Sequence, residues 1–376
     1  MAERDTVRIT GTYALSALGR GADALLSGVL TGTPAFGPVR RFDTGGRRVT
    51  VAATLPEVGT LADELADAVD SAGRAAGLGP ADRVDTALFL ATHGGPASLP
   101  VPEGRHEPTG PALADHLAAR CGLGGRTRVY TTACVSASSA VADAATLIRR
   151  GDLDRVVVAA GYLVEPDQYA LFDAGRALAA DGAVRPFSAG RKGLLLGDGV
   201  AAVVLESAAS AARRGAETLA TVDGWGRAGD AYHPCQPHPG GLGLARAVEG
   251  ALRRAALPPG EVGYVNANAT GTPFSDASEA AALTRVFGDR CGRLPVSSTK
   301  AVHGHALEAS GLLELVVTAL ALRHGKLPVT AGWLGPDPQC PLDVIRDAPR
   351  PAGTTHALTL NAAFGGANTA LLVSTP

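Results

Sequence analysis

Lysine is scarce in this sequence. Lys192, Lys300 and Lys326 are the only lysines, so arginine supplies almost all of the 34 basic residues. The arginines form no extended basic cluster, and the formal net charge is -2 at pH 7. This balance gives no electrostatic footprint for nucleic acid or an anionic membrane surface. We therefore expect a small-molecule or protein-borne substrate, with no nucleic-acid or membrane partner.

Long apolar runs are missing as well. No stretch of the sequence reaches the length of about 18 uninterrupted apolar residues that can span a bilayer. The opening residues, MAERDTVRITG, contain no basic segment followed by an apolar stretch, which a secretory signal would need. These two observations predict a cytoplasmic protein.

Signs of disulfides and of nucleotide binding are absent too. The five cysteines are Cys121, Cys134, Cys235, Cys291 and Cys340. Their irregular spacing in a chain of 376 residues favours reduced thiols over a disulfide framework. No glycine-rich loop follows a predicted strand in the pattern that cradles phosphate, so the sequence indicates no nucleotide cofactor.

What the sequence does contain is a repeated α/β pattern. Four short apolar runs of the first half have counterparts, in the same order, in the second half. The pairs are TALFLAT (86–92) with VGYVNAN (262–268), RVYTTA (128–133) with LPVSST (294–299), RVVVAAG (155–161) with HALTLNA (356–362), and VAAVVLE (200–206) with TALLVST (369–375). Repetition of this kind predicts a duplicated α/β fold, with one half in residues 1–210 and the other in residues 211–376.

In each half, a nearly all-apolar stretch follows the second run, at 135–150 in the first half and at 306–325 in the second. Helices that are apolar all round are buried, so both are expected at the centre of the molecule. Cys134 lies directly before the first stretch, where a helix N-terminus favours a thiolate over a thiol. The position predicts an activated nucleophile, although an isolated cysteine in such a place is more often a small buried residue.

The sequence around Cys134, TACVS (132–136), resembles the acyl-accepting site of the β-ketoacyl synthase, or ketosynthase, family. The family has this cysteine in a stretch like Thr-Ala-Cys-Ser-Ser. Similar segments continue in order at 147–161, 172–179, 185–206 and 230–241, so the resemblance covers nearly the whole chain. It implies an α/β, thiolase-like, duplicated five-layered αβαβα fold.

The resemblance also assigns partners to Cys134. The stretch VSSTKAVHGHALEASG (296–311) is similar to the family's Ser-Ser-Thr-Lys followed by Gly-His. It implies that Lys300 is the active-site lysine, that His305 is a catalytic histidine, and that Glu314 orders the lysine.

Three further residues follow from the same resemblance. Phe364, in NAAFGGAN (361–368), matches the family's aromatic gate, and its backbone N–H would form an oxyanion hole with that of Cys134. The less favoured alternative for Phe364 is a core aromatic residue. Thr270 and Thr272 match the threonines that bind the pantetheine arm of the substrate.

The sequence departs from the family at a catalytic position. Asn268 opens the segment Asn-Ala-Thr-Gly-Thr, where the family has His-Gly-Thr-Gly-Thr. Loss of one oxyanion donor typically costs about two to three orders of magnitude in rate, although an asparagine amide can also donate a hydrogen bond. Decarboxylating condensation is therefore expected to be weakened, whereas binding of a carrier-linked acyl group is retained.

Smaller departures affect the surroundings of the site. His303 stands where a threonine is common, Glu308 where a glycine is common, and Lys192 where the family has an aspartate. The gate loop is one residue shorter, and length is missing between residues 51 and 85 and between 94 and 130. These segments form dimer and substrate surfaces in the family, so chain-length control and partner choice stay open.

His233, Cys235 and His238 have a spacing that could suggest a metal site. The loop that contains them resembles a metal-free segment of the family, so we expect no metal. We also expect no cofactor other than the phosphopantetheine of a carrier protein, or coenzyme A, that presents the acyl group.

Two functions remain open from the sequence. The first is an acyltransferase like β-ketoacyl-ACP synthase, which transfers or condenses acyl groups in polyketide or fatty-acid-like secondary metabolism. The second is a catalytically weak partner subunit that resembles a chain-length factor. Acyl carrier protein is the expected partner, in a homodimer or in a heterodimer with another ketosynthase-like chain.

Overall fold

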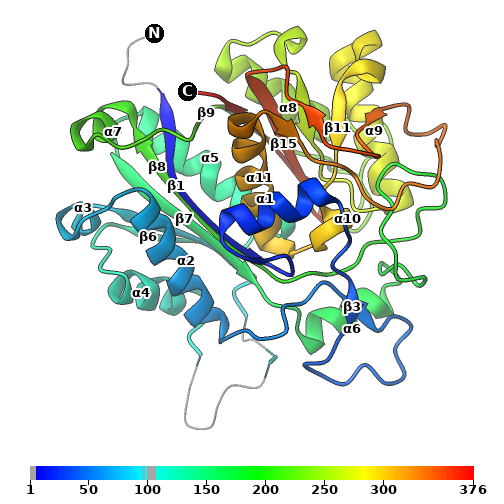
Figure 1. Ribbon diagram of the computed structural model, residues 1–376, viewed down its shortest axis with the longest axis horizontal. Helices are drawn as coiled ribbons and strands as arrows, with labels where there is room; N and C mark the ends of the chain where they lie inside the picture. The colour runs from blue at the N-terminus through cyan, green and yellow to red at the C-terminus, as the bar shows by residue number, and fades with distance from the viewer. Residues whose placement is uncertain (1–5, 96–97, 100–106) are drawn as a thin grey trace.

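A single mixed sheet forms the framework of the protein. The computed structural model describes residues 6–95, 98–99 and 107–376 (Figure 1). Its 12-stranded sheet has the order β13-β11-β10-β15-β16-β9-β1-β8-β7-β5-β6, with β2 paired to β1. The two wings of this sheet, one from each half of the chain, meet where β1 and β9 pair.

The two wings contain equivalent strands. The first wing consists of β1 (Val7–Ser16), β8 (Gly199–Ser207), β7 (Arg155–Tyr162), β5 (Ala87–Ala91) and β6 (Thr127–Tyr130). The second wing consists of β9 (Ala220–Gly229), β16 (Ala367–Ser374), β15 (His356–Ala362), β10 (Tyr264–Asn266), β11 (Pro295–Ser297) and β13 (Asp343–Val344). Each of the four predicted run pairs occupies matching places, counted outward from the junction.

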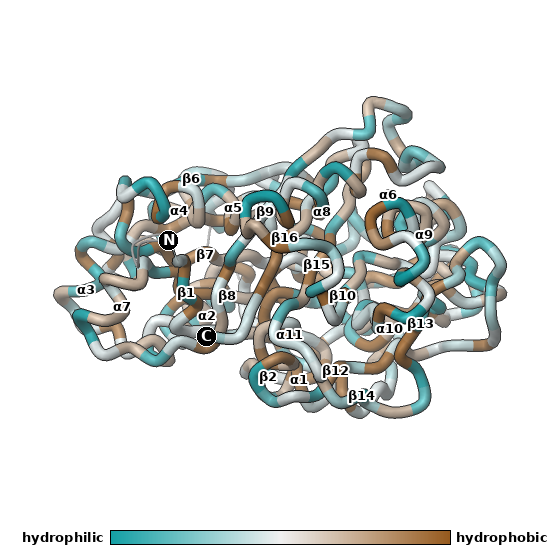
Figure 2. Tube along the Cα trace, turned by 90° about the horizontal axis from the view of Figure 1, so that it is seen from above, coloured by the Kyte–Doolittle hydropathy of each residue, from teal (hydrophilic) through white to brown (hydrophobic). Residues whose placement is uncertain are grey.

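The pattern of strand directions also repeats. β5 runs parallel to β6 and β7, and β10 runs parallel to β11 and β15. The strands nearer the junction, β7-β8-β1 and β15-β16-β9, are antiparallel in both wings. Figure 2 shows the first wing on one side and β15, β10 and β13 of the second wing on the other, with β9 and β16 of the second wing in the middle.

The central layer consists of α5 (Ser136–Arg149) and α11 (Ser310–His324). Both helices contact strands of both wings and each other, so they lie between the wings. Close packing is possible because residue 311 is glycine: a Cβ there would lie 2.3 Å from Ser138 Oγ. Residues 310–322 are all buried, as predicted, whereas α5 leaves one side half-buried.

Further helices cover the outer faces. α2 (Leu61–Ala75) and α4 (Gly110–Arg120) pack on the first wing, α8 (Leu242–Ala255) packs on the second, and α9 (Pro273–Phe287) packs on α8. The predicted five-layered αβαβα, thiolase-like fold is therefore confirmed. The division of the chain at residue 210 stays a prediction.

Short elements complete the described chain. They are β2 (Gly19–Arg20), α1 (Ala22–Thr31), β3 (Gly37–Pro38), β4 (Val51–Ala52), α3 (Pro80–Val84), η2 (Ala133–Val135), α6 (Pro166–Ala174), α7 (Ala208–Arg214), η3 (Pro259–Glu261), η4 (Gly288–Arg293), α10 (Lys300–His303), η5 (Leu307–Ala309), β12 (Lys326–Leu327) and β14 (Arg350–Pro351). None of the helices in the described ranges combines the length and apolarity needed to cross a bilayer.

The sequence contains two stretches rich in proline and glycine, 95–111 and 230–243, a composition that predicts loops. Residues 230–241 of the second stretch form an irregular connection between β9 and α8. The other, residues 95–111, lies partly outside the described residues.

Candidate active site

A cavity of about 470 Å³ opens where the two central helices begin. Six of the residues predicted from the sequence line it: Cys134, Asn268, Thr270, Thr272, His305 and Phe364. The other two, Lys300 and Glu314, lie behind Asn268 and are completely buried. The fold thus brings all the predicted site residues together from both halves of the chain.

Cys134 lies in a sharp strand-to-helix turn. The chain leaves β6, passes through η2 and enters α5, and Ala133 adopts a left-handed φ of 50° on the way. A non-glycine residue held in this region costs free energy and is typical of functional sites. The second half repeats the turn at η5, where Leu307 has a φ of 43° and Glu308 takes the place equivalent to Cys134.

Cys134 lies in surroundings that favour its neutral thiol form. Burial raises its pKa to about 12, the negative charge of Glu308 adds to this effect, and the positive charge of Lys300 only partly opposes it. The expectation of a thiolate was based on the helix N-terminus alone. It stays a prediction, because burial and Glu308 act against the helix contribution whereas Lys300 acts with it.

His305 is a neutral imidazole beside the cavity. Burial, together with the charge of Lys300, lowers the pKa of His305 well below 6.5. Its Nδ1 lies 2.8 Å from Ser310 Oγ, which also accepts a hydrogen bond of 3.0 Å from the backbone N–H of Ala306. The Ser310 hydroxyl still has its hydrogen to donate, and when it donates to Nδ1 the hydrogen of the ring is on Nε2. His305 is then arranged to donate a hydrogen bond.

Asn268 is oriented by a buried chain of polar groups. Lys300 Nζ donates to Glu314 Oε1 and lies 3.4 Å from Asn268 Oδ1, so the Asn268 carbonyl oxygen faces the lysine. The amide nitrogen of Asn268 therefore faces away from Lys300. On the other side of the chain, Asn361 Nδ2 donates to Glu314 Oε2 and Asn361 Oδ1 accepts from Ser138 Oγ, both at 2.5 Å.

Asp276 supports the loop that carries the two threonines. Its carboxylate accepts hydrogen bonds from the backbone N–H groups of Thr270, Gly271 and Phe187. The hydroxyls of Thr270 and Thr272 lie 3.0 Å apart on the cavity wall. The loop therefore presents two adjacent hydroxyls to whatever occupies the cavity.

Phe364 lies at the cavity mouth and stacks on Phe172, with ring centroids 5.9 Å apart. About half of its side chain is exposed, so it is not the core aromatic residue that the sequence left open.

Lys192 and His303, two of the residues that depart from the family pattern, lie in different surroundings. Lys192 lines the cavity and pairs with Asp181 at 3.2 Å. His303 is fully buried, its Nε2 lies 3.0 Å from Thr299 Oγ1, and burial together with Lys300 lowers its pKa to about 3.

His233 and His238 shape their own loop. His233 Nδ1 accepts hydrogen bonds from the backbone N–H groups of Cys235 and Gln236, and His238 Nδ1 accepts one from Gly240. Across the ranges that the structure describes, no group of three or more His, Cys, Asp or Glu side chains is arranged to hold a metal ion.

Comparison with known protein families agrees with the family that the site residues resemble. The model described as "Beta-ketoacyl synthase, N-terminal domain" matches residues 68–211, and "Beta-ketoacyl synthase, C-terminal domain" matches residues 219–333. The chain belongs to the β-ketoacyl synthase family. The resemblance stated from the sequence is confirmed.

Two individual proteins are similar to about two thirds of this chain. The 3-oxoacyl-(acyl-carrier-protein) synthase 2 of Staphylococcus aureus is 36% identical over 258 residues, which cover 67% of this chain and 64% of the relative. Nodulation protein E of Rhizobium leguminosarum bv. trifolii is 41% identical over 263 residues, which cover 69% of this chain and 64% of the relative. The chain thus spans less than two thirds of the length of both.

A solved structure extends the likeness to the whole fold. The structure described as "The ishigamide ketosynthase/chain length factor" superimposes with a TM-score of 0.89 at 28% identity, and the match covers 99% of this chain and 100% of that chain.

Sequence reasoning missed several supporting residues of this member of the β-ketoacyl synthase family. Ser310 and Asn361 were not singled out, although each is a polar residue at the end of an apolar run, where a buried partner can be expected. Asp276 and Ser138 gave no comparable signal because their partners are backbone groups or come from distant segments.

Proposed function

We propose that this chain is an acyltransferase like β-ketoacyl-ACP synthase, which accepts an acyl group on Cys134 and then transfers or condenses it in polyketide or fatty-acid-like secondary metabolism. The observation that carries the proposal is one cavity lined by the Cys134 thiol, the His305 imidazole and the Asn268 amide. An acyl group presented on the phosphopantetheine of a carrier protein, or on coenzyme A, needs no further cofactor.

In the loading step, Cys134 attacks the thioester carbonyl. A new carbon-sulfur bond forms at Cys134, the bond to the carrier sulfur breaks, and the thiol proton ends on the leaving thiol. The backbone N–H groups of Cys134 and Phe364 would stabilise the negative charge on the carbonyl oxygen. Thr270 and Thr272 would bind the pantetheine arm.

In the second step, His305 and Asn268 would stabilise the acceptor. The Nε2–H of His305 and the amide of Asn268 can both donate to a carbonyl oxygen on which enolate charge develops. A neutral amide is the weaker of the two donors, so we propose that decarboxylation of a malonyl thioester is inefficient.

Acylation tests the first step. The purified chain is incubated with acyl-carrier-protein thioesters, and its intact mass is measured. We expect one acyl adduct on the wild type and none on Cys134→Ala, because the variant has no nucleophile at the cavity. Absence of an adduct on the wild type, or an equal adduct on the variant, would contradict the proposal.

Restoring the histidine tests the second step. We expect Asn268→His to increase carbon dioxide release from malonyl thioesters by about tenfold to a thousandfold, since it adds an oxyanion donor of the usual kind. Release is measured with labelled malonyl thioester, and Cys134→Ala/Asn268→His separates decarboxylation from acylation. A wild type that already decarboxylates as fast as the variant would contradict this part.

A second candidate is a partner subunit that resembles a chain-length factor. Asn268 and the ishigamide ketosynthase/chain length factor structure favour it, whereas the retained Cys134 in the cavity favours an enzyme. Purification decides between them. A homodimer that becomes acylated supports the enzyme, and obligate association with a second ketosynthase-like chain supports the partner. The cytoplasmic location stays a prediction.

A further inference from the structure

Three buried polar residues, Tyr162, Glu165 and Glu308, form a cluster at η5 with the half-buried His93, here called the His93 cluster. Glu308 Oε1 accepts a hydrogen bond of 3.1 Å from the backbone N–H of His93 and lies 3.1 Å from its Nδ1. His93 Nε2 lies 3.8 Å from Glu165 Oε1. Glu308 and Glu165 are only 2% and 4% exposed, so the two carboxylates lie inside the protein.

The Tyr162 hydroxyl is the unexplained member of this cluster. The residue is 1% exposed, and its hydroxyl has no hydrogen-bond partner in the described part of the chain. Tyr162 ends β7, which packs against η5, the turn that carries Glu308, and Glu165 follows three residues later in the chain. Burial raises the pKa of Tyr162 well above 10, and the charges of Glu308 and Glu165 raise it further. A buried hydroxyl without a partner costs free energy unless a ligand or a water supplies one.

The cluster lies beside Cys134 and not at the cavity mouth. The turns η2 and η5, which carry Cys134 and Glu308, pack against each other. Glu308 contributes more to the raised pKa of Cys134 than any other charged group. None of the four cluster residues lines the cavity that contains Thr270, Thr272 and Phe364. Because η2 packs against η5, an acyl group that extends from the Cys134 sulfur towards η5 would approach these polar side chains.

This environment discriminates between acyl groups. A long hydrocarbon chain would bury apolar surface against carboxylates and would leave the Tyr162 hydroxyl without a partner, which is unfavourable. A short acyl group with a hydroxyl or amino substituent could donate to Glu308 and accept from Tyr162. Sites built to hydrogen-bond a substrate group reject analogues that lack it, because their own buried polar groups are left unpaired.

We infer that the His93 cluster selects a short acyl group carrying a hydrogen-bond-donating substituent, a hydroxyl or an amine. The inference rests on the proposed function, since it names the substrate class of Cys134. Tyr162 and Glu308 are the specificity-determining residues. Glu308 stands where the resemblance to the family predicts a glycine, so this selectivity belongs to the chain's own sequence.

Loading rates test the inference with matched thioesters. Butyryl, 3-hydroxybutyryl, 3-aminobutyryl and octanoyl carrier-protein thioesters are compared by the initial rate of adduct formation on the full chain. We expect at least one of the two substituted groups to load about tenfold faster than butyryl, and octanoyl to load slowest. The substituted pair distinguishes a hydroxyl from an amine. Equal rates for butyryl and both substituted groups would overturn the inference.

Tyr162→Phe is the sharpest variant. It removes one oxygen atom that has no partner in the described chain, so the melting temperature should not fall. We expect it to reduce the preference for the substituted acyl group by about tenfold. Glu308→Gln should reduce it as well, whereas Tyr13→Phe on β1 should leave it unchanged. An unchanged preference in both Tyr162→Phe and Glu308→Gln would show that the cluster is structural.

A binding measurement separates the two proposals. If no thioester loads, acylation by Cys134 is wrong, but selectivity can still be measured with acyl-pantetheine amides, which cannot transfer. Calorimetry should then show tighter binding of a substituted butyryl amide than of the butyryl amide, and Tyr162→Phe should remove the difference. Equal affinities would overturn the inference independently of the chemistry.

Discussion

At the scale of single residues, buried charges of opposite sign surround the nucleophile. Lys300 favours loss of the Cys134 proton, whereas Glu308 opposes it together with burial. These surroundings favour the thiol form of Cys134, and in the proposed loading step its proton ends on the leaving thiol. Such an arrangement limits reaction of Cys134 with other electrophiles, because the thiolate is the reactive form.

Glu279 provides a pH-dependent prediction. It is 2% exposed, its Oε1 accepts from the backbone N–H of Asn268 at 2.8 Å, and its Oε2 is buried without a partner in the described chain. Burial raises its pKa from 4.5 to about 8. The folded protein therefore binds this proton more tightly than the unfolded chain, and stability is lost as pH rises from 4.5 towards 8.

We expect Glu279→Gln to remove this loss. Relative to wild type, the variant should gain about 3 to 4 kcal/mol of unfolding free energy between pH 5 and pH 9. Urea unfolding at the two pH values measures the difference. Glu249→Gln, on the surface of α8, is the control and should follow the wild type. A constant difference between Glu279→Gln and wild type at both pH values would contradict the prediction.

The sequence was sufficient to predict those site residues whose roles depend on their neighbours in the chain. Cys134 at a strand-to-helix junction, and Lys300 and His305 within one short segment, could be predicted from local pattern and resemblance. The protonation of Cys134 could not, because it depends on Glu308, which is 174 positions away in the chain. Tyr162 gave no signal for the same reason: a missing partner becomes visible only when the surroundings are known.

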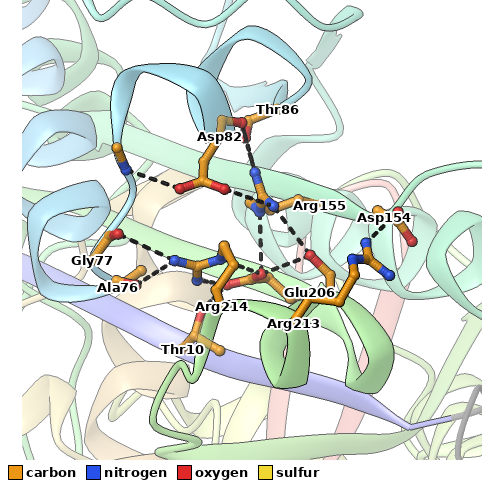
Figure 3. Close-up of polar contacts among 12 residues, drawn as sticks. Thr10, Ala76, Gly77, Asp82, Thr86, Asp154, Arg155, Glu206, Arg213 and Arg214 are labelled. Atoms are coloured by element: carbon orange, nitrogen blue, oxygen red, sulfur yellow. Dashed lines mark hydrogen bonds and ion pairs between the residues drawn. The ribbon is translucent and has the colours of Figure 1, made fainter.

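At the scale of elements, an ionic network fixes the end of the first half. Glu206 at the end of β8 is completely buried and accepts hydrogen bonds from Thr10, Arg155, Ser210 and Arg214 (Figure 3). Burial raises the pKa of Glu206, but the hydrogen bonds from Arg214 and Thr10 outweigh this and lower it overall. The network holds β1, β7, β8 and α7 together.

The same contacts extend to the outer helices. Arg155 donates to the carbonyl oxygen of Asp82 in α3, and Arg214 donates to the carbonyl oxygens of Ala76 and Gly77 after α2. Figure 3 shows Arg155, from β7, and Arg214, from α7, both directed at Glu206. Through these two arginines, the Glu206 carboxylate connects the sheet to the outer helices α2 and α3.

Glu206→Gln should be strongly destabilising. The amide leaves two arginines partly buried with less than their full compensating charge, and breaking a buried ion pair in this way costs about 3 to 5 kcal/mol. The denaturant midpoint measures the loss. Glu217→Gln, which removes an exposed pair with Arg323, should change stability by less than about 1 kcal/mol. Comparable losses in the two variants would contradict a specific role for the network.

At the scale of the whole molecule, the two halves share one central layer. The repeated apolar runs were enough to predict the equivalent strands and the two buried helices. They could not show that β1 and β9 pair into one continuous sheet, because this junction involves only residues 7–9 and 220–222. Register over three residues is set by tertiary packing and leaves no pattern in the sequence.

Shared packing predicts that neither half folds alone. In a fragment of residues 1–215, α5 would lose its contacts with β9 and β16, and in a fragment of residues 216–376, α11 would lose β1 and β8. Each fragment would expose an apolar face of the central layer to water. We expect no cooperative thermal transition, followed by circular dichroism, in either fragment. A sharp transition in one fragment alone would show that this half is an independent domain.

Co-expression of the two fragments should restore the fold. With a tag on one fragment, both should purify together and melt cooperatively, because α5 and α11 regain each other and both wings. Gly311→Val in the second fragment is the control, since a Cβ at this position would lie 2.3 Å from Ser138 Oγ. It should prevent association, and because Cys134 and His305 come from different fragments, acyl loading should disappear with it. Association of the Gly311→Val fragment at wild-type yield would mean that the halves are joined through the β1–β9 junction and not through the central helices.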